Sequence, residues 1–404
     1  MAIEIKKRRV KNPVTALSKG LEEKLLRQGY GADTIWKQRR LLNDLLFWLE
    51  GQHLSLCDLS VAQIDRFMAD RRAAGVRKLK TPKALGPILD HLRGLGLVPN
   101  AEAPVEDGPA GPILDQYRRF LRSERGLAIA TVPRYVDCLR PFLDGRVQDG
   151  GLDLANLTSA DVTSFVVAWC PSLNTGVAKL TLTALRSFLG FLHLDGVLER
   201  SLVPAVPPVL HRRLAGLPKG LERDQVRRLL AACDNGSVNG VRDLAILTLL
   251  VRLGLRRSEV AKLGLDDIDW HAGTVCVHGK GNRHERLPLP ADVGQSVAQY
   301  LRYARPANAE GRMVFVRHIA PHHALSPSRV STIVADVARR AGLGRVHAHR
   351  LRHTAATELL RAGASLPEIG QLLRHRRAQT TAIYAKVDRK NLRLIARPWP
   401  EGAQ

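Results

Sequence analysis

The sequence predicts a mostly α-helical protein with one small antiparallel sheet, in which helical N-terminal modules precede a mixed α/β domain. Residues 14–100 and 112–196 carry apolar side chains at helical spacing. Stretches rich in proline, at 99–112 and 198–220, interrupt that pattern. Short alternating apolar runs later in the chain are typical of strands. Together these observations indicate successive compact segments rather than one long repeat.

Four segments follow from these patterns. We expect an additional helical domain over residues 1–100 and a second helical domain over 108–200. A linker at 201–220 should be extended, because the region is rich in proline. Residues 221–404 should form the mixed domain, with a tail at its C-terminal end. In that domain the strands flank a tight turn at Gly279 and Gly281, and helices precede and follow them.

The two helical domains share a local pattern. "LCDLSVAQIDRF" at 56–67 aligns with "LANLTSADVTSF" at 154–165, and in each a Ser or Thr precedes an amphipathic helix as its N-cap. Gly29 has a counterpart in Gly126 at nearly the same offset. The pattern indicates a duplication, although two short helical domains also share such features by chance.

The charge balance favours a polyanionic partner. The chain of 404 residues has 62 Lys and Arg against 38 Asp and Glu, a net charge of +24. Nucleic acid is the commonest partner for such an excess, and a generally basic, solvated surface is the alternative. A membrane surface is disfavoured, because no long amphipathic helix with aromatic anchors accompanies the basic stretches.

Cysteine usage and apolar run length give further expectations. The five cysteines are far apart and lack CxxC spacing, so they predict neither a disulfide framework nor a zinc site. The longest apolar run, around Ala245 to Val251, is much shorter than the roughly 18 residues of a membrane span. No apolar segment follows the basic N-terminus. We therefore expect a cytoplasmic protein.

The stretch "RVHAHRLRHTAATELL" at 345–360 gathers imidazoles and guanidiniums where a helix begins. Backbone N–H groups at a helix N-terminus, joined by His349, Arg352 and His353, suit a phosphate or a developing oxyanion. The alternative is a basic surface helix with a buried structural histidine. A metal held by His347, His349 and His353 is disfavoured, since no Cys or carboxylate accompanies them and arginines are interleaved.

Two further groups of residues offer phosphate chemistry. Arg256 follows a glycine and a leucine, and its planar fork suits a phosphate, while Glu259 is placed to orient a neighbouring basic side chain. Lys280 stands between two glycines at the expected strand turn, where an ammonium can donate a proton. A solvated hairpin lysine is the simpler interpretation of Lys280 alone.

A histidine and a tyrosine complete the set. His375 follows the end of an apolar helix, and Tyr384 lies nine residues further on. A phenol with a pKa near 10 is a poor nucleophile, so attack on phosphorus needs a cationic pocket and a nearby base. The alternative for Tyr384 is a buried aromatic with a hydrogen-bonded hydroxyl.

Taken in order, "GLRRSE", "GKGNRHERLPL", "HRLRHTAAT" and "LLRHRRAQTTAIY" resemble the successive motifs of the tyrosine recombinases, the phage-integrase family of DNA strand-transfer enzymes. The resemblance covers 221 to about 390 and continues more weakly over 112–196, which is similar to the family's core-binding domain. It implies a catalytic domain of tyrosine-recombinase type, and residues 1–100 would be a SAM-like, core-binding-like addition.

The resemblance also implies roles. Arg256 and Arg352 would be the catalytic arginines and Tyr384 the nucleophile, and Lys280 would protonate the leaving 5′ oxygen. The remaining implied positions are His349 and His375 as catalytic histidines, with Glu259 and His353 in support. The family's usual Leu-Gly-His is Leu373-Arg374-His375 here, and Arg374 is then a candidate for holding the DNA backbone.

The expected activity is site-specific DNA recombination through a 3′ phosphotyrosine, serving a mobile element, with no cofactor and no metal. Expected partners are double-stranded DNA, further copies of the chain in a tetramer on paired sites, and accessory DNA-bending or directionality proteins; no membrane is involved. Two alternatives remain. One is a type IB topoisomerase that relaxes arbitrary DNA, and the other is a non-catalytic helix-turn-helix regulator, for which "ASLPEIGQLLRHRRAQTTAIY" offers a pattern.

Overall fold

The computed structural model describes residues 2–76, 78–79, 81–99, 108–129, 131–148, 151–208, 220–234, 236–279, 284–375, 377–388 and 392. The chain separates into two compact units, Asn100–Arg213 and a unit made of Met1–Pro99 with Leu214–Gln404. The described part is mostly helical, with a three-stranded antiparallel sheet and a two-stranded ribbon, which confirms the predicted fold class. The segment boundaries expected from the sequence stay a prediction.

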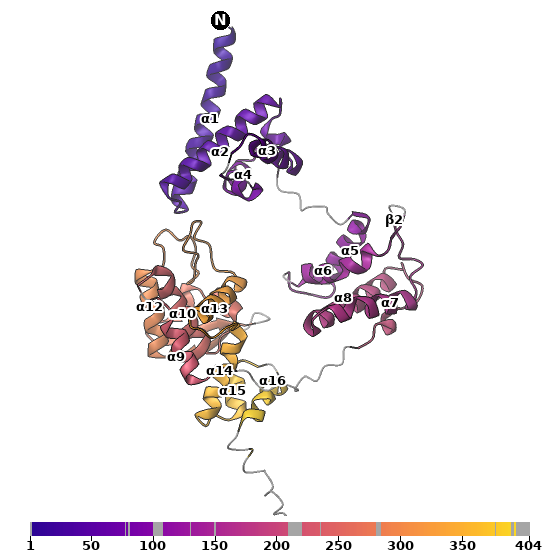
Figure 1. The fold of residues 1–404 in the computed structure, drawn as a ribbon, viewed down its shortest axis with the longest axis vertical. Helices are drawn as coiled ribbons and strands as arrows, with labels where there is room; N and C mark the ends of the chain where they lie inside the picture. Colours follow the sequence, from indigo (N-terminus) through magenta and orange to yellow (C-terminus); the bar gives the residue numbers. More distant parts are fainter. Residues whose placement is uncertain are drawn as a thin grey trace, which may run out of the picture. The chain divides into compact units, whose positions relative to one another are not determined.

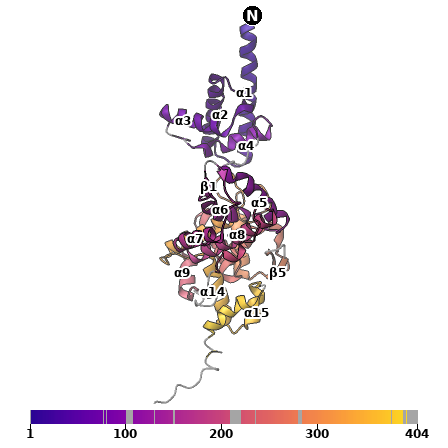
Figure 2. The same cartoon turned by 90° about the vertical axis from the view of Figure 1, so that its right-hand side faces the viewer.

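The N-terminal helices surround a core of their own. They are α1 (Ala2–Arg27), α2 (Ala32–Gly51), α3 (Val61–Ala73) and α4 (Gly86–Gly94), with short 3-10 turns η1 (Leu56–Asp58) and η2 (Pro82–Leu85) between them. Helix α1 extends beyond the other three (Figures 1 and 2). Leu42, Leu45 and Phe67, all from the expected apolar faces, are buried in this core.

The second unit is also helical. It contains η3 (Gly108–Ala110), α5 (Gly111–Ser123), α6 (Val132–Asp144), the ribbon β1 (Val147–Gln148) and β2 (Gly151–Leu152), α7 (Ser159–Trp169), η4 (Cys170–Ser172), α8 (Thr175–Leu194) and η5 (Val203–Ala205). Its core includes Tyr117, which packs edge-on against Phe188 and donates a hydrogen bond to the Ala184 carbonyl. Val206, inside the expected linker, is buried in this core.

Helix α8 is the central helix of this unit. Among the described helices it is long and apolar enough to cross a membrane, although the sequence contains no long uninterrupted apolar run there. Slightly more than half of its apolar window, 56%, is buried inside the unit. Leu182, Leu185 and Phe188 point into the core, as in the central helix of a folded domain.

The two helical modules begin corresponding helices in the same way. Ser60 caps α3 by accepting a hydrogen bond from the Gln63 N–H, and Thr158 caps α7 by accepting one from the Asp161 N–H. These caps lie 98 positions apart (158 minus 60). Both are reciprocal capping boxes, which confirms the N-caps predicted from the aligned segments. Gly29 and Gly126 share a positive φ as well, at +82° and +56°. This agreement favours the duplication.

The mixed domain packs helices around a central helix whose residues are mostly buried. Its elements are α9 (Arg223–Ala231), α10 (Val238–Arg252), α11 (Arg257–Ala261), η6 (Leu265–Asp267), β3 (Ile268–Asp269), β4 (Thr274–His278), β5 (His284–Pro288), α12 (Ala291–Tyr303), α13 (Pro327–Arg340), α14 (Ala348–Arg361), α15 (Leu366–Leu372), α16 (Ala378–Thr381) and η7 (Ala382–Val387). Helix α10 packs against α12, α13 and α14 and buries Ile246, Leu249 and Leu250. The strand order β3-β4-β5 is antiparallel throughout, as the turn at Gly279 and Gly281 predicted.

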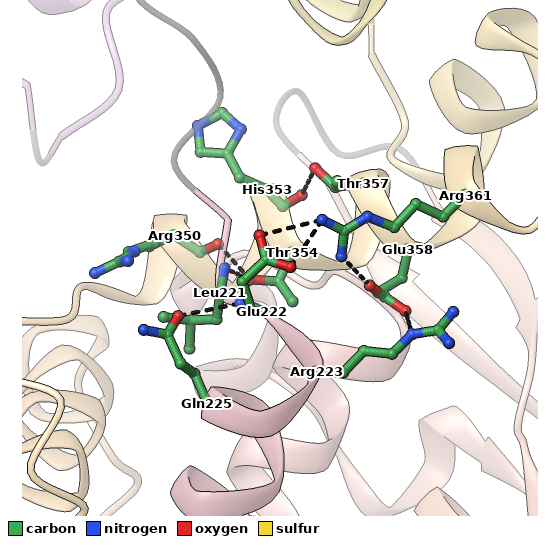
Figure 3. Close-up of polar contacts among 10 residues, drawn as sticks. All are labelled: Leu221, Glu222, Arg223, Gln225, Arg350, His353, Thr354, Thr357, Glu358 and Arg361. Carbon is green, nitrogen blue, oxygen red and sulfur yellow. Dashed lines mark hydrogen bonds and ion pairs between the residues drawn. The ribbon is translucent and has the colours of Figure 1, made fainter. Parts of the chain in front are cut away.

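The start of the mixed domain is attached to α14 (Figure 3). The Leu221 N–H donates to the Thr354 hydroxyl at 2.8 Å, and Arg361 pairs with Glu222 across the same junction. Glu358 bridges Arg223 and Arg361. These contacts join segments more than 130 residues apart and hold α14 from its outer side, while the imidazole of His353 points away from the ion pairs.

Candidate active site

Arg352, in the first turns of α14, is almost completely buried, with 2% of the residue exposed. Its guanidinium donates to the Gly254 carbonyl at 2.6 Å and to the Leu373 carbonyl. Gly254 has a φ of +58°, and a Cβ there would lie 2.7 Å from the Leu373 side chain. Glycine therefore suits both the left-handed backbone and the close approach of the loop after α10 to Leu373. The contacts place Arg352 between two chain segments far apart in sequence.

Arg256 and Glu259 meet at the start of α11. Glu259 is buried, and its carboxylate accepts from the Arg256 backbone N–H at 2.7 Å and from the Arg256 guanidinium at 2.6 Å. The Arg256 side chain remains 38% exposed. A charge-assisted pair of this kind fixes the direction of the guanidinium and leaves its outer edge open to solvent.

Arg374 ends α15 in an unusual conformation. Its φ is +55°, the left-handed region, and its N–H and that of His375 donate back to Gln371 and Gly370, the pattern of a helix end that usually has glycine at this position. A side chain in this conformation costs roughly 1–2 kcal/mol. The Arg374 guanidinium is buried and donates to Glu259 at 2.8 Å. It is therefore not presented to solvent as a DNA-backbone contact would be.

Three arginines satisfy the last carbonyls of α15. The Leu372 carbonyl accepts from Arg374, the Leu373 carbonyl from Arg352 and the Arg374 carbonyl from Arg256. Carbonyls at a helix C-terminus lack partners within the helix and attract cations. The same arginines that the sequence singled out as phosphate ligands thus also hold the segment that leads to His375.

Tyr384 lies on η7 and is 2% exposed, packed against Ala356, Ile369 and Leu373. Its hydroxyl is 2.9 Å from Nδ1 of His353, and the His353 ring contacts that of His349 with 4.6 Å between centroids. His375 Nδ1 lies 2.8 Å from the Thr381 hydroxyl of α16. The histidines and the tyrosine therefore form a connected set across α14, the end of α15 and η7.

Burial and the arginines shift the pKa values of this set. Desolvation by burial lowers the pKa of His353 and of His375 to about 4 each, and neighbouring cationic groups add to the shift. Burial also lowers the pKa of His349, with Arg352 and Arg256 as further causes. Burial raises the pKa of Tyr384 to about 12, although Arg352 opposes it. At neutral pH the histidines are neutral and the phenol keeps its proton.

Electrostatic interactions connect the remaining members. His375 interacts with Arg352, Arg256 and His349, and Arg352 interacts with Arg256 and Tyr384. Arg256, Glu259, Arg374 and His375 line a cavity of about 1160 Å³. The structure thus brings together Arg256, Glu259, His349, Arg352, His353, His375 and Tyr384. Lys280 lies outside the described residues.

A separate group of potential metal ligands lies on the exposed face of the sheet. Donor atoms of Cys276, His278 and His284 are within 4.8 Å of one another, because His278 and His284 pair across β4 and β5. This proximity depends on strand register and was not visible in the cysteine spacing. Arg286 faces Cys276 in the register, and Asp267 already binds Nε2 of His278 at 2.6 Å. We assign no metal to these residues.

Comparison with known proteins agrees with this geometry. The model of the phage integrase family matches residues 219–391, and that of the phage integrase N-terminal SAM-like domain matches 114–196. An integrase/recombinase of Sinorhizobium fredii, y4rA, is 42% identical over 95% of this chain and 93% of its own length. The tyrosine recombinase XerC of Oceanobacillus iheyensis is 31% identical over 69% of this chain and 93% of its own length.

Solved structures share the fold at low sequence identity. XerH site-specific recombinase bound to a palindromic difH substrate aligns with a TM-score of 0.55 at 16% identity, over 96% of each chain. A lambda integrase dimer bound to a COC′ core site gives 0.55 at 17% identity, over 79% of this chain and 89% of that chain. From its family matches and its relatives, the chain belongs to the phage integrase family of tyrosine recombinases, the enzymes of site-specific recombination that cleave and rejoin DNA strands.

Proposed function

We propose that Tyr384 of this recombinase attacks a backbone phosphate of duplex DNA and forms a 3′ phosphotyrosine. The observation that carries the proposal is the convergence of Tyr384, His353 and Arg352 with His375 and with Arg256, which comes from a segment at least 96 positions earlier in the chain (352 minus 256). Such a concentration of cationic and imidazole groups around one phenol suits the charge that develops on phosphate oxygens in the transition state.

In the proposed step the phenolic oxygen bonds to phosphorus as the bond from phosphorus to the 5′ oxygen breaks. The phenolic proton passes to a neutral imidazole, and Nδ1 of His353 is within hydrogen-bonding distance in the tautomer protonated on Nε2. Lys280 gives a proton to the leaving 5′ oxygen, and Arg256, Arg352, His349 and His375 stabilise the phosphate oxygens. A 5′ hydroxyl reverses the step without a cofactor, a metal or ATP, because the phosphodiester bond energy is kept in the phosphotyrosine.

Glu259 acts in the proposal by orienting Arg256, since its carboxylate holds both the backbone and the guanidinium of that residue. Burial of Tyr384 and its raised pKa keep the phenol protonated before DNA binds. The bound phosphate then lies within reach of the phenolic oxygen. The arginines make the attack favourable by stabilising the charge on the phosphate oxygens.

The proposed partner is double-stranded DNA, as the net charge of +24 favours. We further propose a tetramer on paired sites in the cytoplasm, serving a mobile element, with accessory DNA-bending or directionality proteins. A lambda integrase tetramer bound to a Holliday junction, which shares the fold with a TM-score of 0.53, supports the assembly.

The test uses nicked suicide substrates that contain candidate sites, incubated with wild type, with Tyr384→Phe and with Tyr303→Phe. We expect a denaturant-resistant protein–DNA adduct from wild type and from Tyr303→Phe, an exposed tyrosine, and none from Tyr384→Phe. An adduct that persists in Tyr384→Phe would exclude the proposed nucleophile. Equal relaxation of arbitrary supercoiled plasmids would instead indicate a topoisomerase.

A further inference from the structure

Arg374 occupies a position where the helix-end geometry favours glycine. The left-handed φ of +55° and the two backbone hydrogen bonds to Gln371 and Gly370 form whether or not a side chain is present. An arginine here therefore makes the local backbone less favourable than glycine would. The contacts of the guanidinium indicate what offsets this cost.

The guanidinium of Arg374 lies behind Arg256, on the other side of one shared carboxylate. Glu259 accepts from Arg374 through Oε2 at 2.8 Å and from Arg256 through Oε1 at 2.6 Å. The side chains of Arg374 and Glu259 are 3% and 2% exposed, whereas that of Arg256 is 38% exposed. Arg256 is thus the more exposed of the two guanidiniums. Arg374 is linked to Arg256 through Glu259 and through the Arg374 carbonyl, which accepts from Arg256 at 3.3 Å.

The charge balance of this group differs from that of a simple pair. With Glu259 and Arg256 alone, one negative and one positive charge would cancel. With Arg374 the group carries two positive charges and one negative, so a net positive charge remains for a phosphate that Arg256 contacts. Burial lowers the pKa of Arg374, with Glu259 opposing the shift, and its Nε has no hydrogen-bond partner among the described residues. Glu259 is therefore the anionic partner that holds this guanidinium in place.

We propose that Arg374 is a positioning residue, which shares the carboxylate of Glu259 and so keeps Arg256 oriented and leaves the group of three side chains with a net positive charge toward the scissile phosphate. The inference rests on the proposed function, because it assigns Arg256 to that phosphate. Arg374 does not touch the DNA in this account. Its effect reaches the reaction through Glu259 and through the backbone that leads to His375.

The first test is Arg374→Gly, which removes the side chain and suits the left-handed backbone. Glu259 keeps Arg256 as its partner, and the adjoining cavity admits water, so the variant should fold with a thermal midpoint no lower than that of wild type. Its single-turnover cleavage of suicide substrates should slow by at least about tenfold, since misplacing a catalytic group by about 1 Å costs about 100-fold. Non-covalent DNA affinity, measured in a Tyr384→Phe background, should change little.

The second test separates charge from shape. The double variant Arg374→Gly/Glu259→Gln restores a net positive charge to the group, so it should cleave faster than Arg374→Gly. A purely structural role predicts the opposite, because the second substitution weakens the contacts that orient Arg256. If the glycine variant does not fold, Arg374→Gln replaces it, because this variant keeps a polar side chain and removes the charge. It should also cleave slowly.

Arg312→Ala is the matched control. Arg312 also pairs with a carboxylate, that of Asp266, but both partners are exposed, so its cleavage rate should equal that of wild type. If wild type cleaves DNA and Arg374→Gly and Arg374→Gln cleave equally fast, the inference is overturned and the proposed function remains intact. Absence of any adduct in wild type would instead contradict the proposed function.

Discussion

Tyr384 and its neighbours show how one residue's environment sets its chemistry. The phenol is buried against apolar side chains, which raises its pKa to about 12, while the only polar atom that binds its hydroxyl among the described residues is Nδ1 of His353. An imidazole is a suitable proton acceptor only when neutral, and burial keeps the pKa of His353 at about 4. Tyr384 and His353 are therefore both uncharged at neutral pH before DNA binds.

This environment predicts how stability depends on pH. The pKa values of His353 and His375 fall from 6.5 to about 4 on folding, so the unfolded chain binds more protons between these values. The contribution of the two neutral histidines to the stability of the folded state is fully present above pH 6.5 and is lost as the pH falls toward 4. The thermal midpoint of wild type should therefore drop between about pH 7 and about pH 4.5.

Differential scanning calorimetry of wild type and His353→Gln over this range checks the prediction. The variant lacks one of the titrating groups, so its midpoint should fall less steeply than that of wild type. Parallel curves for the two proteins would show that His353 does not titrate with a lowered pKa in the folded state.

The loop between α10 and α11 places the two arginines of the proposed active site. Gly254 lets the backbone approach Leu373 and Arg352, and two residues later Arg256 begins α11 with Glu259 as its partner. This loop joins the end of the central helix to the end of α15. Its geometry therefore depends on a close contact in which an added Cβ would displace the Leu373 side chain.

Gly254→Ala should lower the free energy of unfolding by about 1–3 kcal/mol, because the added Cβ meets the Leu373 side chain in a tightly packed region. It should also slow cleavage, since Arg352 binds the Gly254 carbonyl. Gly273→Ala is a matched control: its φ of +60° is nearly the same, but a Cβ there meets nothing within 4 Å. Chemical denaturation of both variants separates backbone strain from the packing contact. Equal losses would show that the approach to Leu373 is unimportant.

Local chemistry explains which features the sequence predicted. Local features depend on residues within a few positions of one another, so they can be recognised in the sequence. Examples are the N-caps at Ser60 and Thr158 and the strands β4 and β5. The contact between Glu259 and Arg374 spans 115 positions, and the burial of Arg374 depends on it. Neither a motif nor a helical period indicates such a contact, and a surface role for Arg374 was the natural expectation.

At the scale of the whole chain, the duplicated helical pattern bears on DNA binding. The N-terminal helices have their own core and repeat the caps of the second unit, which belongs to the family's SAM-like domain by sequence. We expect this first module to extend the contact with DNA. The whole chain, including this module, aligns with the integrase/recombinase y4rA over 95% of its length.

Deletion of residues 1–100 tests this expectation. The remaining chain keeps both segments that match the family, so it should still form the covalent adduct. Its footprint should shorten, and the dependence of affinity on salt should become shallower because fewer phosphates are contacted. Footprinting and affinity measured over a salt series decide the matter. An unchanged footprint with unchanged affinity would remove DNA contact from the roles of this module.

Peptide mass analysis of the trapped adduct identifies the residue that carries the DNA strand. After nuclease and protease digestion, we expect a single modified peptide that contains Tyr384 linked through phosphate to the 3′ end of a nucleotide. A nucleotide attached to any other residue, or to several, would show that the phenol at position 384 is not the nucleophile.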